Sequence, residues 1–250
     1  MGRWGADFDP DRLADLETAM WKAYYRHQPA RLFGLLIQGL REQGHASWPR
    51  AVAAAFFLTK GAAGFARATG DYERFAPDIA RGYRLLGLPP DVDAVEVGRR
   101  ELRWWVVRRE IGLAAGAAAG EAITRLYAAI YAVPESSVAE AGRLRGKAAE
   151  VRDRGANADP EGQRARGLSY WPEVAQLLRA SYRALHATLN DGPGQPSPAR
   201  RPTTHQAAGN AAAARISLMA SPRRNGVRPL ATPHARSFWY TAISHGTPIR

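Results

Sequence analysis

Apolar residues recur every three or four positions along most of the chain up to about residue 190, which is the spacing of one face of an α-helix. In the first such segment, after Asp9, Leu13 and Met20 lie on the apolar face and Glu17 lies more outward. Asp93 with Glu96, and Ser137 with Glu140, have the spacing of a capping box. We predict helices over about 10–27, 29–44, 48–69, 71–86 with a kink or a break at Ala76, 93–110, 123–131, 137–154 and 171–189.

The segment from Ser47 to Gly70 has no polar face, because residues 51–66 are apolar or small except for Lys60. A helix that is apolar on all sides is normally buried. The run is too short, and too interrupted by Lys60, to span a membrane. We therefore predict an all-α fold, an orthogonal or up-down bundle of seven to eight helices around a buried central helix at about 48–69.

The composition changes after Asn190, where Pro, Ala, Gly, Ser and Arg dominate and the helical period is lost. The tail holds eight arginines and one acid, Asp191, so it carries +7 of the formal +12 and leaves +5 for residues 1–189. A segment that cannot bury apolar surface cannot offset the entropy lost on ordering its backbone. We predict one helical domain over 8–190 and a disordered basic tail over 191–250, which also has the composition of read-through from GC-rich DNA.

Composition excludes several classes of chemistry. The absence of cysteine rules out disulfides, thiolate catalysis and cysteine-based metal sites. The sequence has no dinucleotide-binding Gly-x-Gly-x-x-Gly after a strand, no Walker motif and no Gly-x-Ser-x-Gly elbow. The amino terminus lacks the apolar run of a secretory signal, so we expect a cytoplasmic protein.

Lys60 is the first candidate for a catalytic residue. Burial among apolar residues would lower its pKa and make it a base, an imine-forming amine or an anchor for an anion. The alternative is that its long stem reaches solvent or that its amine pairs with Glu17, Glu101 or Asp78. Glu101 is the second candidate, because it shares one strip of its helix with Trp104 and Arg108. That strip fits either a pocket wall or a solvated rim.

Aromatic residues supply the rest of a possible ligand pocket. Buried tyrosines need hydrogen-bond partners, so several that point into one cavity would form a pocket with polar tips. The ordinary alternative is that aromatic residues at helical spacing belong to the core. The predicted pocket residues are Tyr24, Tyr83, Trp104, Arg108 and Tyr127.

Metal and nucleic-acid sites have weaker support. Helical di-iron proteins use paired Glu-x-x-His spacings, whereas this chain has one, Glu42 with His45, at a probable helix end. We therefore expect no metal and no cofactor. Arginines of the fifth and seventh helices offer phosphate contacts, but acidic residues are interleaved with them, as on a salt-bridged helix surface.

Three functions remain open. The first is a non-enzymatic protein-interaction or regulatory module, because amphipathic helices and a basic tail suffice to bind a protein partner or to self-associate. The alternative is a helical small-molecule-binding protein or enzyme with a pocket around Lys60 and Glu101. A weak association with nucleic acid is the third, and the sequence leaves enzymatic activity undecided.

Overall fold

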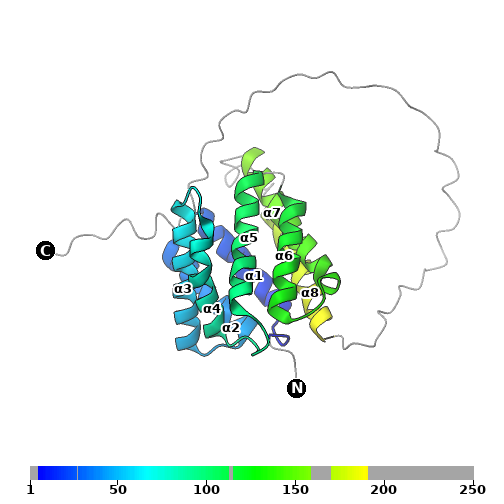
Figure 1. The fold of residues 1–250 in the computed structure, drawn as a ribbon. Coiled ribbons are helices and arrows are strands. Elements are labelled where there is room, and N and C mark those ends of the chain that lie inside the picture. The colour runs from blue at the N-terminus through cyan, green and yellow to red at the C-terminus, as the bar shows by residue number, and fades with distance from the viewer. Residues whose placement is uncertain (1–4, 27, 113–114, 159–169, 191–250) are drawn as a thin grey trace, which may run out of the picture. The chain divides into compact units, whose positions relative to one another are not determined.

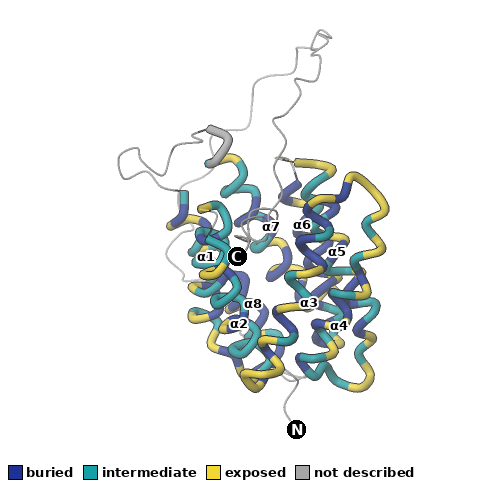
Figure 2. Tube along the Cα trace, turned by 90° about the vertical axis from the view of Figure 1, so that its left-hand side faces the viewer, coloured by how far each residue is buried: buried dark blue, intermediate teal, exposed yellow. Residues whose placement is uncertain are grey.

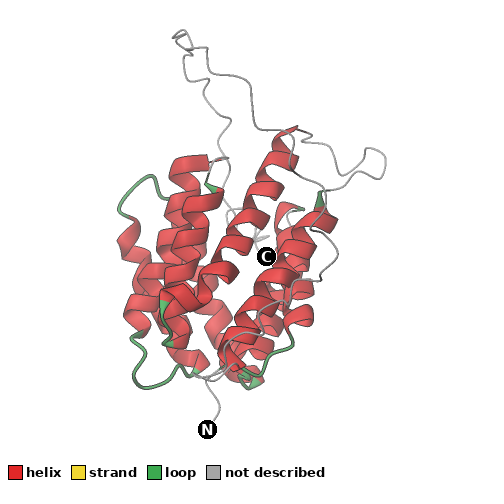
Figure 3. Ribbon diagram, turned by 90° about the vertical axis from the view of Figure 1, so that its right-hand side faces the viewer, coloured by secondary structure: helices red, strands yellow, loops and turns green. Residues whose placement is uncertain are grey.

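The computed structural model describes residues 5–26, 28–112, 115–158 and 170–190, and the all-α prediction is confirmed there. These residues form α-helices and one short 3-10 helix, η1, with no strand among them (Figures 1 and 3). The predicted tail, 191–250, lies outside the described residues. The elements are α1 (Pro10–Tyr25), α2 (Pro29–Gly44), α3 (Trp48–Arg67), η1 (Tyr72–Phe75), α4 (Ala76–Leu86), α5 (Ala94–Ile111), α6 (Gly116–Tyr131), α7 (Glu135–Ala158) and α8 (Trp171–Asn190).

The eight α-helices of the described residues pack in a closed ring that follows the order of the chain. Each helix lies against the next, from α1 to α8, and α8 returns to α1. Every extensive backbone contact between described α-helices joins neighbours in this order, and η1 lies against α3, α4 and α5. α1 and α5 lie on opposite sides of this ring (Figure 2). Their long side chains meet in the interior, where Tyr25 of α1 contacts Arg108 of α5.

Helix ends agree with the sequence where a side chain forms the cap. Asp9 accepts hydrogen bonds from the backbone N–H groups of Asp11 and Arg12, at 2.9 and 3.1 Å. Asp93 accepts one from Val95 at 2.8 Å. The predicted cap at Ser137 is wrong, because α7 already begins at Glu135, directly after Pro134.

The predicted break at Ala76 is confirmed. η1 ends at Phe75 and α4 begins at Ala76, so Pro77 lies in a first turn, where its missing N–H costs nothing. The end of α3 differs from the predicted range of about 48–69. The helix stops at Arg67, and Arg109 donates hydrogen bonds to the carbonyls of Phe65 and Ala68, both at 2.9 Å. Arg109 thus satisfies carbonyls that a left-handed glycine cap would otherwise serve.

α3 contributes one face to the bundle rather than its whole circumference. Its buried residues are mainly alanine and glycine, and glycines at the α3–α4 contact let the two helices approach closely. A Cβ atom added at Gly82 would lie 3.2 Å from the backbone oxygen of Ala54. Large apolar residues on the other face are exposed, beginning with Trp48. The alanine and glycine residues of α3 therefore allow close packing on the face that meets α4.

The alanine and glycine run after Gly112 precedes the predicted helix at 123–131, and it is already helical from Gly116 onward. Residues 113 and 114 lie outside the described residues. Gly116 and Gly120 face Gly142 and Gly146 of α7. A Cβ atom at Gly146 would lie 2.4 Å from the carbonyl oxygen of Gly116, which is closer than atoms can approach. Small residues on both helices thus set the distance between α6 and α7.

Candidate functional site in the ring interior

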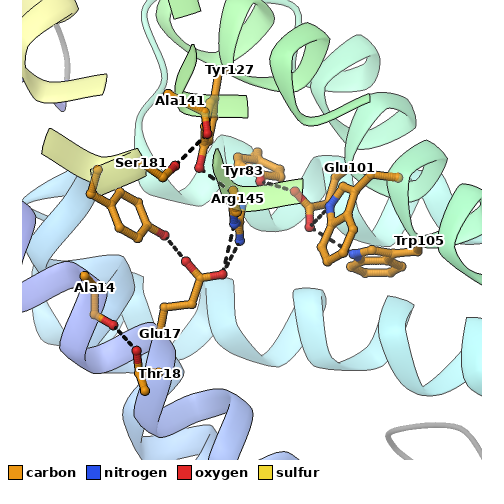
Figure 4. A network of polar contacts seen from close by, with 12 residues as sticks. Ala14, Glu17, Thr18, Tyr83, Glu101, Trp105, Tyr127, Ala141, Arg145 and Ser181 are labelled. Atoms are coloured by element: carbon orange, nitrogen blue, oxygen red, sulfur yellow. Dashed lines mark hydrogen bonds and ion pairs between the residues drawn. The ribbon is translucent and has the colours of Figure 1, made fainter. Parts of the chain in front are cut away.

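A buried ion pair joins α1 to α7 inside the ring. Arg145 donates from Nε and Nη2 to the same oxygen, Oε1 of Glu17, at 2.9 and 2.6 Å. The hydroxyl of Tyr182, on α8, donates to the other Glu17 oxygen (Figure 4). The Nη1 of Arg145 lies 3.4 Å from the hydroxyl of Tyr127. Four elements that are far apart in the sequence thus share one charged group.

Glu17 was expected to lie outward, but the structure buries it. It follows Leu13 by one helical turn, so the two side chains lie on the same face of α1. Only 3% of the Glu17 side chain is exposed. Neither Glu17 nor Arg145 was a predicted site residue. The sequence did contain one sign that Glu17 is buried, because Glu17 lies on the helical stripe that also holds Leu13 and Met20. Its charge, however, favoured an outward position.

Glu101 lies in a second cluster, and its carboxylate accepts three hydrogen bonds. Trp104 and Trp105 donate their indole N–H groups to Oε1 at 3.0 and 3.1 Å. Tyr83, on α4, donates its hydroxyl to Oε2 at 2.9 Å. The acceptors of Glu101 are thus used by aromatic side chains, which hold the carboxylate in one orientation (Figure 4).

A third group joins α5 to α7, which are not neighbours in the ring. Nη2 of Arg108 donates to both oxygens of Asp153, at 2.9 and 2.8 Å. Arg152 also binds Asp153, at 2.7 Å, and its guanidinium stacks on the ring of Tyr25 with a centroid distance of 3.1 Å. Residues of α1, α5 and α7 therefore meet in the interior although the backbones of these helices make no extensive contact.

Trp104 connects these groups. Its ring centroid lies 5.6 Å from the guanidinium carbon of Arg145 and 5.9 Å from that of Arg108. Both distances are within the range of a cation–π interaction. Three acids and three arginines thus occupy one region and cancel in formal charge: Glu17, Glu101, Asp153, Arg108, Arg145 and Arg152.

The surroundings shift several pKa values. Burial alone lowers the pKa of Arg145, but the surrounding Glu17, Tyr127, Tyr182 and Glu101 together outweigh burial, so this pKa lies well above its ordinary value. Burial, followed by the charge of Glu101, raises the pKa of Tyr83 well above its ordinary value. Burial and the charge of Glu17 do the same for Tyr182. The arginine therefore stays charged, and both tyrosines remain hydrogen-bond donors at neutral pH.

The side chain of Arg145 keeps some solvent-accessible surface. Its side chain is 17% exposed, although Glu17, Tyr127 and Tyr182 around it are almost fully buried. A guanidinium carries five N–H groups, and the hydrogen bonds of Arg145 to other described residues use three of them. The two that remain have no partner among the described residues.

The structure brings together most of the predicted pocket residues. Tyr83, Glu101 and Trp104 are in contact, while Tyr127 and Arg108 lie beside Arg145 and Trp104, respectively. Burial raises the pKa of Tyr24, and the nearby charges of Arg108, Arg152 and Asp153 also act on it, so Tyr24 lies close to the third group. Whether these residues bind a ligand stays a prediction.

Lys60 is not part of this interior. Its amine binds Asp78, one of its three predicted partners, at 2.8 Å, and 57% of its side chain is exposed. Of the two alternatives for Lys60, a side chain that reaches solvent and pairs with an acid is therefore confirmed, and a desolvated lysine is not found. A lysine on the outer side of α3 reaches solvent even though the residues around it in the sequence are apolar.

The other candidate sites are occupied by internal contacts. Glu42 binds Arg12 at 3.0 Å, and the described residues contain no group of three His, Asp or Glu side chains placed to hold a metal ion. Most of the arginines considered for phosphate contact have internal partners, such as Glu140 for Arg143. Within the described parts of the chain, none of the helices has the length and apolar character of a membrane span.

Comparisons with protein-family models, with curated proteins and with solved structures find no match for this chain. The function is therefore inferred from the ring interior.

Proposed function

We propose that the chain binds a small carboxylate in the interior of the helical ring, with Arg145 as the principal ligand-binding residue. The observation that carries the proposal is the combination of accessible surface and two unpartnered N–H groups on Arg145. A guanidinium recognises a carboxylate through two parallel hydrogen bonds. Glu17 holds the other edge of the group and fixes its direction.

The aromatic residues beside Arg145 indicate what the rest of the ligand is. Trp104 and Tyr127 each place a ring centroid within 5.8 Å of the Arg145 guanidinium carbon. Aromatic faces favour a planar, apolar body. The ligand class is therefore an aromatic or otherwise planar carboxylate, and the proposal includes no chemical reaction.

The cost of the charged interior supports a functional role. Burying ion pairs is often no more favourable than filling the same space with apolar side chains. Three acids and three arginines in one interior are therefore weakly explained by stability alone. Ionisable groups that are shifted and clustered in this way are typical of binding and catalytic sites.

Isothermal calorimetry and thermal unfolding of the full chain with benzoate test the proposal. A ligand with nine heavy atoms has an expected Kd of about 1 mM. At ten times Kd, benzoate stabilises the fold by about 1.4 kcal/mol. Benzamide, which has the same shape without the charge, is expected to have little effect.

The matched variants are Arg145→Lys and Arg125→Lys. Lysine keeps the positive charge opposite Glu17 but lacks the planar fork, so Arg145→Lys is expected to weaken benzoate binding at least tenfold. Arg125 is exposed and pairs with Glu121, so its replacement should leave binding unchanged. Equal stabilisation by benzoate and benzamide, or unchanged benzoate binding by Arg145→Lys, would contradict the proposal.

A further inference from the structure

An exposed apolar ridge runs along the outer side of α3. It consists of Trp48, Val52 and Phe56, whose exposed fractions are 55%, 42% and 56%. Residues four apart share one stripe of a helix. Among the described residues, the only other large apolar side chain with comparable exposure is Ile111. This α3 ridge is therefore a single concentrated feature rather than scattered surface hydrophobicity.

Positive charge lies on both sides of the α3 ridge. On the α2 side, the guanidinium of Arg41 stacks on Trp48 at 4.2 Å from the ring centroid. On the α4 side, Arg81 stacks on Phe57 at 4.3 Å, and the Phe57 ring lies 5.3 Å from that of Phe56. Lys60 continues the stripe one turn beyond Phe56.

Acidic groups do not balance these cations. Asp78 is the acid that an ion pair brings to this side of α3, and it is bound to Lys60. Arg41 and Arg81 form no ion pair with a described acid, so their charges remain available to a partner. A second copy of the chain on the same ridge would place like charges together, which disfavours self-association there.

We propose that the α3 ridge binds an amphipathic helix of a protein partner whose apolar stripe is flanked by acidic residues. From Trp48 to Phe56 the ridge rises about 12 Å, or two helical turns. It therefore fits a partner helix that presents apolar residues at positions i, i+4 and i+7. Acidic residues on both sides of that stripe would meet Arg41 and Arg81. This interaction is independent of the carboxylate site in the ring interior.

Phage display with the full chain as bait tests the proposal. The probe is a library of 18-residue helical peptides with a fixed leucine stripe and randomised flanking positions. We expect Asp and Glu to be enriched at the flanking positions at least fivefold over the starting library. Enrichment of neutral or basic flanks, or the absence of any enriched peptide, would overturn the proposal.

Two variants separate the apolar contribution from the charged one. Val52→Ser/Phe56→Ser removes exposed apolar surface and is expected to lower the affinity of a selected peptide at least tenfold. Arg41→Gln/Arg81→Gln should abolish the preference for acidic flanks. Unchanged peptide affinity in the first variant would contradict the assignment. So would a dimer of the wild-type chain in analytical ultracentrifugation that Val52→Ser/Phe56→Ser dissociates, because the ridge would then bind a second copy.

Discussion

At the scale of single residues, the pair of Glu17 and Arg145 has the largest expected effect on stability. Arg145→Met would leave the Glu17 carboxylate buried without its cation, which typically costs 3–5 kcal/mol. Urea denaturation should show this loss in the free energy of unfolding. The double variant Glu17→Gln/Arg145→Met removes both charges and should recover at least about 1 kcal/mol. Arg145→Met with a loss below about 1 kcal/mol would contradict a buried, coupled pair.

The buried tyrosines predict how stability depends on alkaline pH. Tyr83 and Tyr182 have pKa values raised well above the ordinary 10.0 in the folded state. The unfolded chain therefore loses these protons first as pH rises above about 10. Each such tyrosine lowers the free energy of unfolding by about 1.4 kcal/mol per pH unit in that range.

Urea denaturation between pH 9 and 11 measures this slope. Its steepness should decrease in Tyr83→Phe/Tyr182→Phe, because phenylalanine has no proton to lose. If the free energy of unfolding depends on pH equally in this variant and in the wild type, the raised pKa values of Tyr83 and Tyr182 would be contradicted.

The sequence predicted which residues lie together when several of them shared a helical spacing. It did not predict the burial of a single charged side chain. The strip of Glu101, Trp104 and Arg108 follows from helical spacing, and its members do lie together. Glu17 was misplaced, and the two alternatives for Lys60 stayed open, because the sequence shows which residues are charged but not which face of a helix meets a neighbour. A lysine in an apolar segment is exposed, and a glutamate on a charged helix is buried.

At the scale of elements, the α6–α7 contact predicts a contrast between two glycines. A Cβ atom at Gly146 would overlap the backbone of α6, so Gly146→Ala should cost about 2 kcal/mol or more by forcing the helices apart. Gly34, within α2, has no neighbour within 4 Å of an added Cβ atom, so Gly34→Ala should be neutral or stabilising by about 0.5–1 kcal/mol. Thermal unfolding measures both, and equal effects would contradict the close packing.

The spacing of apolar residues predicted where the α-helices lie. It did not predict where several of them begin or end. Side-chain caps such as Asp9 are local and therefore readable from sequence. The end of α3 is set by Arg109, which follows the helix by about forty residues. Capping by a residue so distant in the chain depends on the tertiary fold, and no local rule identifies it.

At the scale of the whole molecule, the closed ring of helices explains why the candidate site is built from long polar and aromatic side chains. A ring of eight helices without extensive contacts across it has an interior that only long side chains reach, and here these are arginines, acids and aromatic residues. The sequence indicated a bundle but not the closure of α8 on α1, because closure joins the two ends of the domain. That closure brings Tyr182 of α8 to Glu17 of α1, whereas Tyr83 and Glu101 meet because α4 packs against its neighbour α5.

An NMR titration of the full, ¹⁵N-labelled chain with benzoate tests directly whether a carboxylate binds inside the ring. We expect saturable shifts of the Arg145 Nε–Hε signal and of the Trp104 and Trp105 indole signals. The indole signal of the exposed Trp48 should remain unchanged, as should all these signals with benzamide. Unchanged Arg145 and Trp104 signals at saturating benzoate, or equal shifts at Trp48, would contradict a carboxylate site inside the ring.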